Sequence, residues 1–113
     1  MQFKYWIYEH EPGNEVPVSA FRSALERAGC ECVAPLGEPG ALGIVLFREA
    51  SPALRTFVQR TSKNGLERLV AVPVTDERVC GAVAWPLRRA GASDVIPGRD
   101  VEAAVQALLA RAA

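Results

Sequence analysis

The 113-residue chain has little of the chemistry that a metal or redox site needs, with only three cysteines and one histidine. Cys30 and Cys32 form a Cys-x-Cys pair, while Cys80 and His10 are distant from it in the sequence. Zinc sites usually take four Cys or His ligands, redox pairs are usually spaced Cys-x-x-Cys, and an odd cysteine count is a poor disulfide framework. We therefore expect no metal, no cofactor and no redox activity. Cys32 is predicted to face inward from a strand, Cys30 to lie at a turn or strand edge, and Cys80 to be buried in a helix.

Long apolar runs and net charge are also absent. No apolar run reaches the roughly 20 residues of a membrane helix, and the opening MQFKYWIYEHEPG lacks the basic start and apolar stretch of a secretion signal. Thirteen basic residues balance thirteen acidic ones, so no global field draws the chain to nucleic acid or to an anionic membrane. Four basic positions close together in sequence are interpreted as a solvated face: Arg55, Arg60, Lys63 and Arg68. We expect a cytoplasmic protein without direct contact to nucleic acid or membrane.

Half of the residues are hydrophobic, which is enough for one core in a single domain, residues 1–113. Apolar segments bounded by Gly, Pro and polar residues predict strands at 3–8, 31–35, 43–47, 69–74 and 93–97. Helical spacing predicts helices between Pro17 and Gly29, between Ser51 and Asn64, between Thr75 and Gly91, and after Asp100. This alternation predicts an α/β fold, an open five-stranded parallel sheet with helices on both faces.

Prolines and glycines modify this pattern at three places. The segment LGEPGAL between the second and third strands is too short and too rich in Gly and Pro for an ordinary helix, so the second helix should be short or missing. Pro73 should lie at the end of its strand or at a bulge, because it cannot donate to a ladder. Pro86 should kink the third helix or split it near Trp85.

Polar residues follow the strands of the predicted sheet at its carboxyl edge, where ligands of open parallel sheets gather. They are Glu9, His10 and Glu11, then Arg48 and Glu49, then Thr75 and Asp76, and finally Pro97, Gly98 and Arg99. No strand is followed by GxxxxGK[ST] or GxGxxG, so nucleotide binding by those loops is not expected. His10 is expected in a surface loop.

The order of elements, the helix after LVAVPVT and the ending GASDVIPGRDVEAAVQALLARA resemble the receiver domain of bacterial response regulators, a flavodoxin-like fold. The resemblance assigns the acid pair of a receiver to Glu9 and His10, the phosphoacceptor aspartate to Arg48, the hydroxyl residue to Thr75 and the lysine to Pro97 or Gly98. Only Thr75 and one acid keep the receiver chemistry. Arg48 is permanently cationic and cannot accept a phosphoryl group.

The resemblance therefore implies a degenerate receiver whose pocket does not transfer phosphate. Arg48 would either form an ion pair with Glu9 or Glu11, in place of a bound metal, or remain a solvated charge. Glu49 would become the acceptor only if the strand register slipped by one residue, which would also turn its side chain to the other face.

A degenerate receiver would signal through protein contacts, without enzymatic activity. Receivers commonly pair through the last two helices and the strand between them, which here would present Trp85, Leu87, Arg88, Arg89, Asp94 and Arg99. The segment AWPLRRAGASDVI further resembles degenerate receivers at the N-termini of activators that work with the alternative sigma factor sigma-N. The resemblance thus implies the N-terminal part of a longer transcription regulator, and a homodimer or a contact with other regulatory domains.

The competing interpretation is an enzyme or a small-molecule binder. Glu9, His10, Arg48 and Thr75 could bind an anionic metabolite at the same edge. No recognisable pair of nucleophile and base supports catalysis, however.

Overall fold

The computed structural model describes residues 3–10, 18–34, 40–49, 51–62, 68–74 and 77–112, without the side chains of 77–80 and 112. Along the chain the elements are β1 (Lys4–Glu9), α1 (Val18–Arg27), β2 (Glu31–Cys32), β3 (Leu42–Phe47), α2 (Pro52–Ser62), β4 (Arg68–Pro73), α3 (Glu77–Ala90), β5 (Asp94–Val95) and α4 (Val101–Ala112). The predicted alternation of strands and helices is confirmed.

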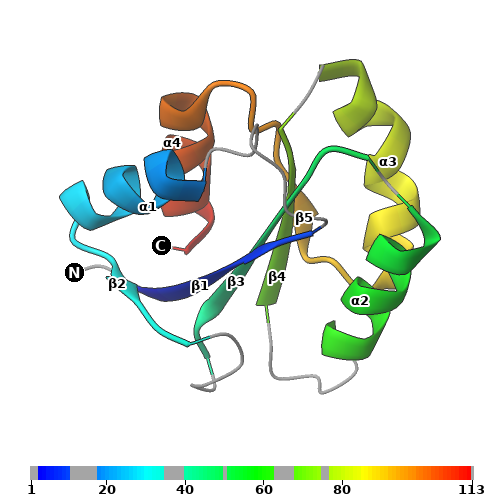
Figure 1. Ribbon diagram of the computed structural model, residues 1–113, viewed down its shortest axis with the longest axis horizontal. Helices are drawn as coiled ribbons and strands as arrows, with labels where there is room; N and C mark the ends of the chain where they lie inside the picture. Colours follow the sequence, from blue (N-terminus) through cyan, green and yellow to red (C-terminus); the bar gives the residue numbers. More distant parts are fainter. Residues whose placement is uncertain are drawn as a thin grey trace.

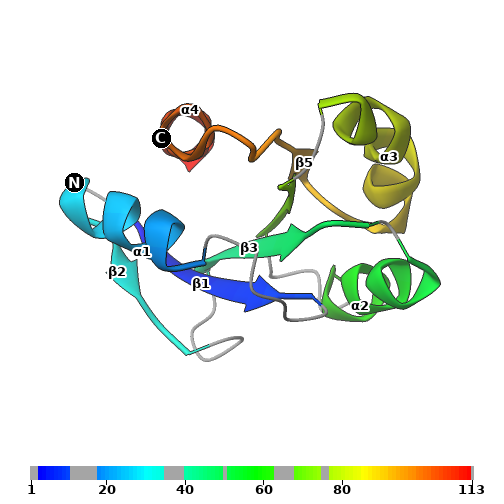
Figure 2. The same ribbon diagram turned by 45° about the horizontal axis from the view of Figure 1, so that its top comes forward.

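The five strands form one parallel sheet in the order β2-β1-β3-β4-β5. Helices α1 and α4 cover one face and α2 and α3 cover the other (Figures 1 and 2). This is the flavodoxin-like α/β architecture that the sequence predicted. Between β2 and β3 the described residues, 33–34 and 40–41, are not helical, in agreement with the expected loss of a helix there.

Alternation along the central strands builds two cores, one on each face. Ile44 and Leu46 of β3 pack with α1 and α4, whereas Val45 and Phe47 pack with α2 and α3. All six residues of β3 are buried, as expected of a strand covered on both sides. Pro73 is the last residue of β4, where its missing N–H interrupts no further ladder bond.

Of the two cysteine predictions, one is confirmed and one is wrong. Cys30 lies at a turn, as expected, and is buried, whereas Cys32 is exposed and does not face inward. The Cys30 N–H donates to the Leu25 carbonyl at 3.0 Å, so Cys30 belongs to the turn that ends α1 and points into the core. Cys32 instead lies in β2, an edge strand of two residues.

Of the two outcomes expected at Pro86, a kink or a split, the split does not occur, since α3 is continuous from Glu77 to Ala90, and the kink stays a prediction. A proline deprives the carbonyl four residues earlier of its helical donor, here that of Ala82. Ala82 and Pro86 both lie on the exposed side of the helix, so water can hydrate the released carbonyl.

Cys80 lies in α3 as predicted, but its side chain is outside the described part. None of the described helices has both the length and the hydropathy to cross a membrane.

Candidate functional site

The carboxyl edge of the sheet brings together four of the five residues predicted for the degenerate pocket. Glu9 ends β1, and the His10 N–H donates to the Leu46 carbonyl of β3 at 2.9 Å. Arg48 follows the last residue of β3 directly. The Gly98 N–H donates to the Pro73 carbonyl of β4, also at 2.9 Å. The fifth residue, Thr75, lies outside the described residues, as do Glu11 and Asp76.

His10 is not a surface-loop residue, because only 8% of it is exposed. Its Nε2 forms a 3.2 Å hydrogen bond with Ser51 Oγ, and its ring is tilted against that of Tyr8 with centroids 6.0 Å apart. Ser51 is the N-cap of α2, since its Oγ accepts from the Leu54 N–H at 3.1 Å. The hydrogen bond of His10 therefore joins the end of β1 to the start of α2.

Arg48 and Glu49 place their side chains in solvent where β3 ends. The ion pair of Arg48 with Glu9 or Glu11 stays a prediction. Among the described residues, no three His, Cys, Asp or Glu side chains lie close enough together to hold a metal ion.

Gly98 is buried where a receiver would carry its lysine. A Cβ atom at this position would lie 3.2 Å from the Pro73 carbonyl oxygen and 3.3 Å from Val74 Cγ1, and closer still to Val72 Cγ1. These distances are tighter than ordinary van der Waals contact, and two of the three neighbours are held by β4. A lysine at position 98 would therefore have to displace the end of β4. The carboxyl edge of the sheet thus has no room for a lysine side chain at this position.

The predicted interface residues separate into two groups. Trp85 is 69% exposed, with the Arg89 guanidinium 6.0 Å from its ring centroid, and Arg88, Arg89 and Arg99 are exposed as well. Leu87 is fully buried in the core between the sheet and α2–α3, so its assignment to the interface is wrong. It lies four residues after Val83 and therefore on the same, inward face of α3.

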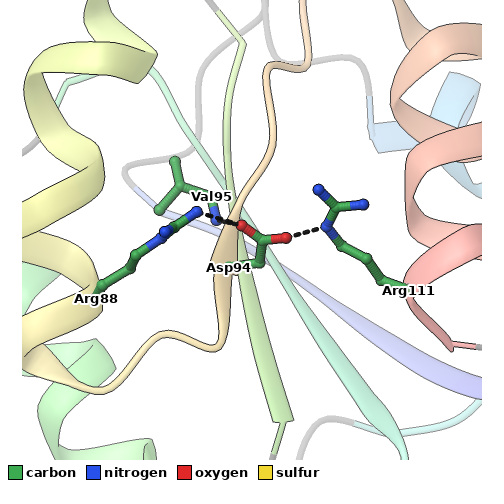
Figure 3. Close-up of polar contacts among 4 residues, drawn as sticks. All are labelled: Arg88, Asp94, Val95 and Arg111. Atoms are coloured by element: carbon green, nitrogen blue, oxygen red, sulfur yellow. Dashed lines mark hydrogen bonds and ion pairs between the residues drawn. The ribbon is translucent and has the colours of Figure 1, made fainter.

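Asp94 joins three elements at the start of β5 (Figure 3). Its Oδ1 accepts from Arg88 of α3 at 2.7 Å and from the Val95 N–H at 2.8 Å, and its Oδ2 accepts from Arg111 Nε of α4. Burial of the carboxyl raises its pKa, but the hydrogen bonds from Arg111, Val95 and Arg88 outweigh it, and the pKa of Asp94 lies below its ordinary value. Asp94 is thus a structural link between α3 and α4 that shapes the predicted interface.

Replacing Asp94 with asparagine should lower the free energy of unfolding by about 1 kcal/mol near neutral pH, because both arginines are half exposed and the pairs are partly screened. A pKa that is lower in the folded state stabilises the protein above the ordinary pKa of about 3.9, and that contribution is lost as the pH falls through the folded value. The difference between wild type and Asp94→Asn, measured by urea unfolding, should therefore shrink steadily as the pH falls below the ordinary carboxyl pKa of about 3.9.

Glu102→Gln is the matched control, because the Arg27–Glu102 pair of 2.8 Å is exposed on both sides. It should change stability by less than about 0.5 kcal/mol. An Asp94→Asn deficit that persisted undiminished in acid would contradict a charge-based link.

Sequence reasoning missed Ser51 as the partner of His10 and Arg111 as the second partner of Asp94. The sequence marks Ser51 only as the start of a helix, and the separation of 41 positions from His10 leaves no local signal. For Arg111, a basic residue in the last turn of the helix after β5 was the available signal.

Comparisons of this chain with protein-family models, with curated proteins and with solved structures found no match. Its function must therefore be inferred from its own residues and geometry.

Proposed function

We propose that this protein is a receiver-like signalling module that does not accept phosphate and acts through protein–protein contacts. The observation that carries the proposal is Arg48, a permanent cation at the carboxyl end of β3 in a sheet of order β2-β1-β3-β4-β5. In a receiver this position holds the nucleophilic carboxylate. A guanidinium there is no nucleophile, and it would repel a cation instead of binding it.

Two further features support a fixed pocket. Gly98 has no room for the lysine that pairs with a bound phosphoryl group in a receiver. His10 is buried against the N-cap of α2, so the position of the second acid carries a packed imidazole instead of a metal ligand exposed to solvent.

The surface that would carry the signal is formed by α3, β5 and α4. It presents Trp85, Arg88, Arg89 and Arg99 around the Asp94 link. Exposed tryptophan and arginine are the residue types most enriched at the energetic centres of interfaces. We propose self-association or contact with an output module through this surface, and as that output a transcription activator dependent on sigma-N.

Incubation with a small acyl phosphate donor and Mg²⁺ should leave the intact mass unchanged, because no carboxylate occupies the acceptor position. Sedimentation before and after treatment should be identical. If a phosphoryl adduct formed, the proposal would fail, and Glu49→Gln would then show whether the neighbouring carboxylate is the acceptor. Trp85→Ala should weaken any dimer seen in the untreated protein.

A second candidate function rests on His10 and Ser51. A buried imidazole beside a hydroxyl at the N-terminus of a helix could bind a small anion, since the helix dipole favours negative charge there. A set of small anions should then raise the melting temperature of wild type but not of His10→Phe. An equal or absent shift in both proteins would exclude this function.

A further inference from the structure

A groove runs along the surface between α2 and α3. One part is lined by Arg55, Ala82, Val83, Pro86 and Leu87, and a neighbouring part by residues that include Arg55, Pro86 and Arg89. Arg55 and Pro86 belong to both parts, which makes the groove continuous. The two helices lie side by side in both views (Figures 1 and 2).

The contact at the ends of the helices explains why the groove opens where it does. Ser62 Oγ at the end of α2 donates to the Ala90 carbonyl at the end of α3, at 3.2 Å. Gly91, with φ of 125°, approaches Ser62 so closely that a Cβ atom would overlap its side chain. The helices are therefore held tightly at their C-terminal ends. Farther from these ends, where Arg55 and Ala82 face each other across the two helices, the side chains leave the groove open.

The shape of the groove suits the side chains of a partner better than a cofactor. Its two parts, of about 240 and 340 Å³, are open to solvent, whereas small-molecule sites enclose most of their ligand. The part that includes Ala82, Val83 and Pro86 is mainly apolar and matches an apolar side chain of a partner segment, while the neighbouring part adds polar side chains, among them Arg89.

The charge around the groove has one sign. By sequence, α2 and α3 carry five arginines and one acid, Glu77, a net charge of +4 that leaves −4 for the rest of this formally neutral chain. Arg88 is paired with Asp94. Within the described part of the chain, the Arg55 side chain forms no ion pair or hydrogen bond, and the Arg89 guanidinium lies 6.0 Å from the centroid of the exposed Trp85 ring.

Pro86 adds a polar anchor to this apolar and basic surface. Because it has no N–H, the carbonyl of Ala82 lacks its helical donor, and both residues line the groove. A partner segment can donate a hydrogen bond to this carbonyl while its acidic side chains reach the arginines. A nucleic acid would use the arginines but not the apolar floor, and its binding depends on many phosphate contacts.

We propose that the groove between α2 and α3 binds an acidic amphipathic peptide segment of a partner protein, with an apolar side chain in the hollow beside Ala82 and Pro86 and carboxylates on Arg55 and Arg89. The site is separate from the carboxyl edge. A wild-type protein that accepted phosphate would therefore refute the proposed function without affecting this groove, and failure of peptide binding would leave the phosphate result unchanged.

Selection of phage-displayed random peptides of about 12 residues on the wild-type protein tests the proposal. The enriched peptides should combine Asp or Glu with Leu, Phe or Trp, and a synthetic consensus peptide should change the emission of the exposed Trp85. In a calorimetric titration of that peptide, Arg55→Glu should weaken binding about tenfold or more, because it replaces attraction with repulsion.

Two other variants make the result specific to the groove. Ala82→Gln should also weaken binding, because it narrows the groove without changing its charge, and glutamine is well tolerated in helices. Arg60→Glu makes the same charge change on α2 at a residue that does not line the groove, so its effect should stay below threefold. The proposal fails if no acidic and apolar consensus is enriched, if Arg60→Glu and Arg55→Glu act equally, or if a 12-nucleotide thymidine oligomer binds more tightly than the peptide.

Discussion

Truncating Leu87 to alanine is expected to lower the free energy of unfolding by about 2–5 kcal/mol, because it removes a fully buried side chain from the core under α2 and α3. Trp85→Ala, two residues earlier on the same helix, should change it by no more than about 1 kcal/mol. Trp85 is 69% exposed, and its contact with Arg89 is an exposed cation–π pair. Urea unfolding of both variants gives the comparison.

The same pair separates stability from association. If the surface formed by α3, β5 and α4 is an interface, Trp85→Ala should raise the dimer dissociation constant in sedimentation while the domain stays folded. Leu87→Ala should act only through unfolding. Equal stability losses in the two variants would contradict the arrangement of α3, whereas equal effects on a folded dimer would restore Leu87 to the interface.

The fold was predictable because its signals are local and repeated. The apolar run of β3, the N-cap at Ser51 and the proline at the end of β4 each act within a few residues of their position. Each also agrees with the others on a parallel sheet covered on both faces. Leu87 was predictable too, since its spacing of four from Val83 places both on one side of a helix.

The contacts at the carboxyl edge and at Asp94 were not predictable, because they join residues that only the folded chain brings together. His10 meets Ser51 across 41 residues, and Asp94 meets Arg111 across 17. The order of strands and helices in the sequence predicted which residues lie at the carboxyl edge of the sheet. Whether a side chain at that edge is exposed depends on the helix packed beside it. His10 was therefore placed at the right edge and wrongly in solvent. Cys32 was wrongly placed inward, because it lies in an edge strand of only two residues.

Gly43, the second residue of β3, provides the second large expected effect. A methyl group at this position would lie 2.6 Å from Leu69 Cδ2 and 2.8 Å from Trp6 Cε2, and nearer still to Trp6 Cζ2. Real side chains do not approach this closely, and Trp6 is fully buried with little space to move. Because Gly43 has no side chain, the Trp6 indole has room to pack against the sheet at this position.

Gly43→Ala should therefore destabilise the protein by about 1–3 kcal/mol through overpacking, measured by urea unfolding. Gly81→Ala on α3 is the matched control, because a Cβ there meets no atom within 4 Å, and it should stabilise by about 0.4–1 kcal/mol by restricting the unfolded chain. In a Trp6→Leu background the cost of Gly43→Ala should fall, since the indole atoms that the methyl meets are gone. An undiminished cost in that background would mean that Leu69 or the strand itself, and not the indole, requires glycine. The same substitution is expected to have opposite signs at the two positions because neighbouring side chains oppose the methyl group at Gly43, whereas at Gly81 they leave space for it.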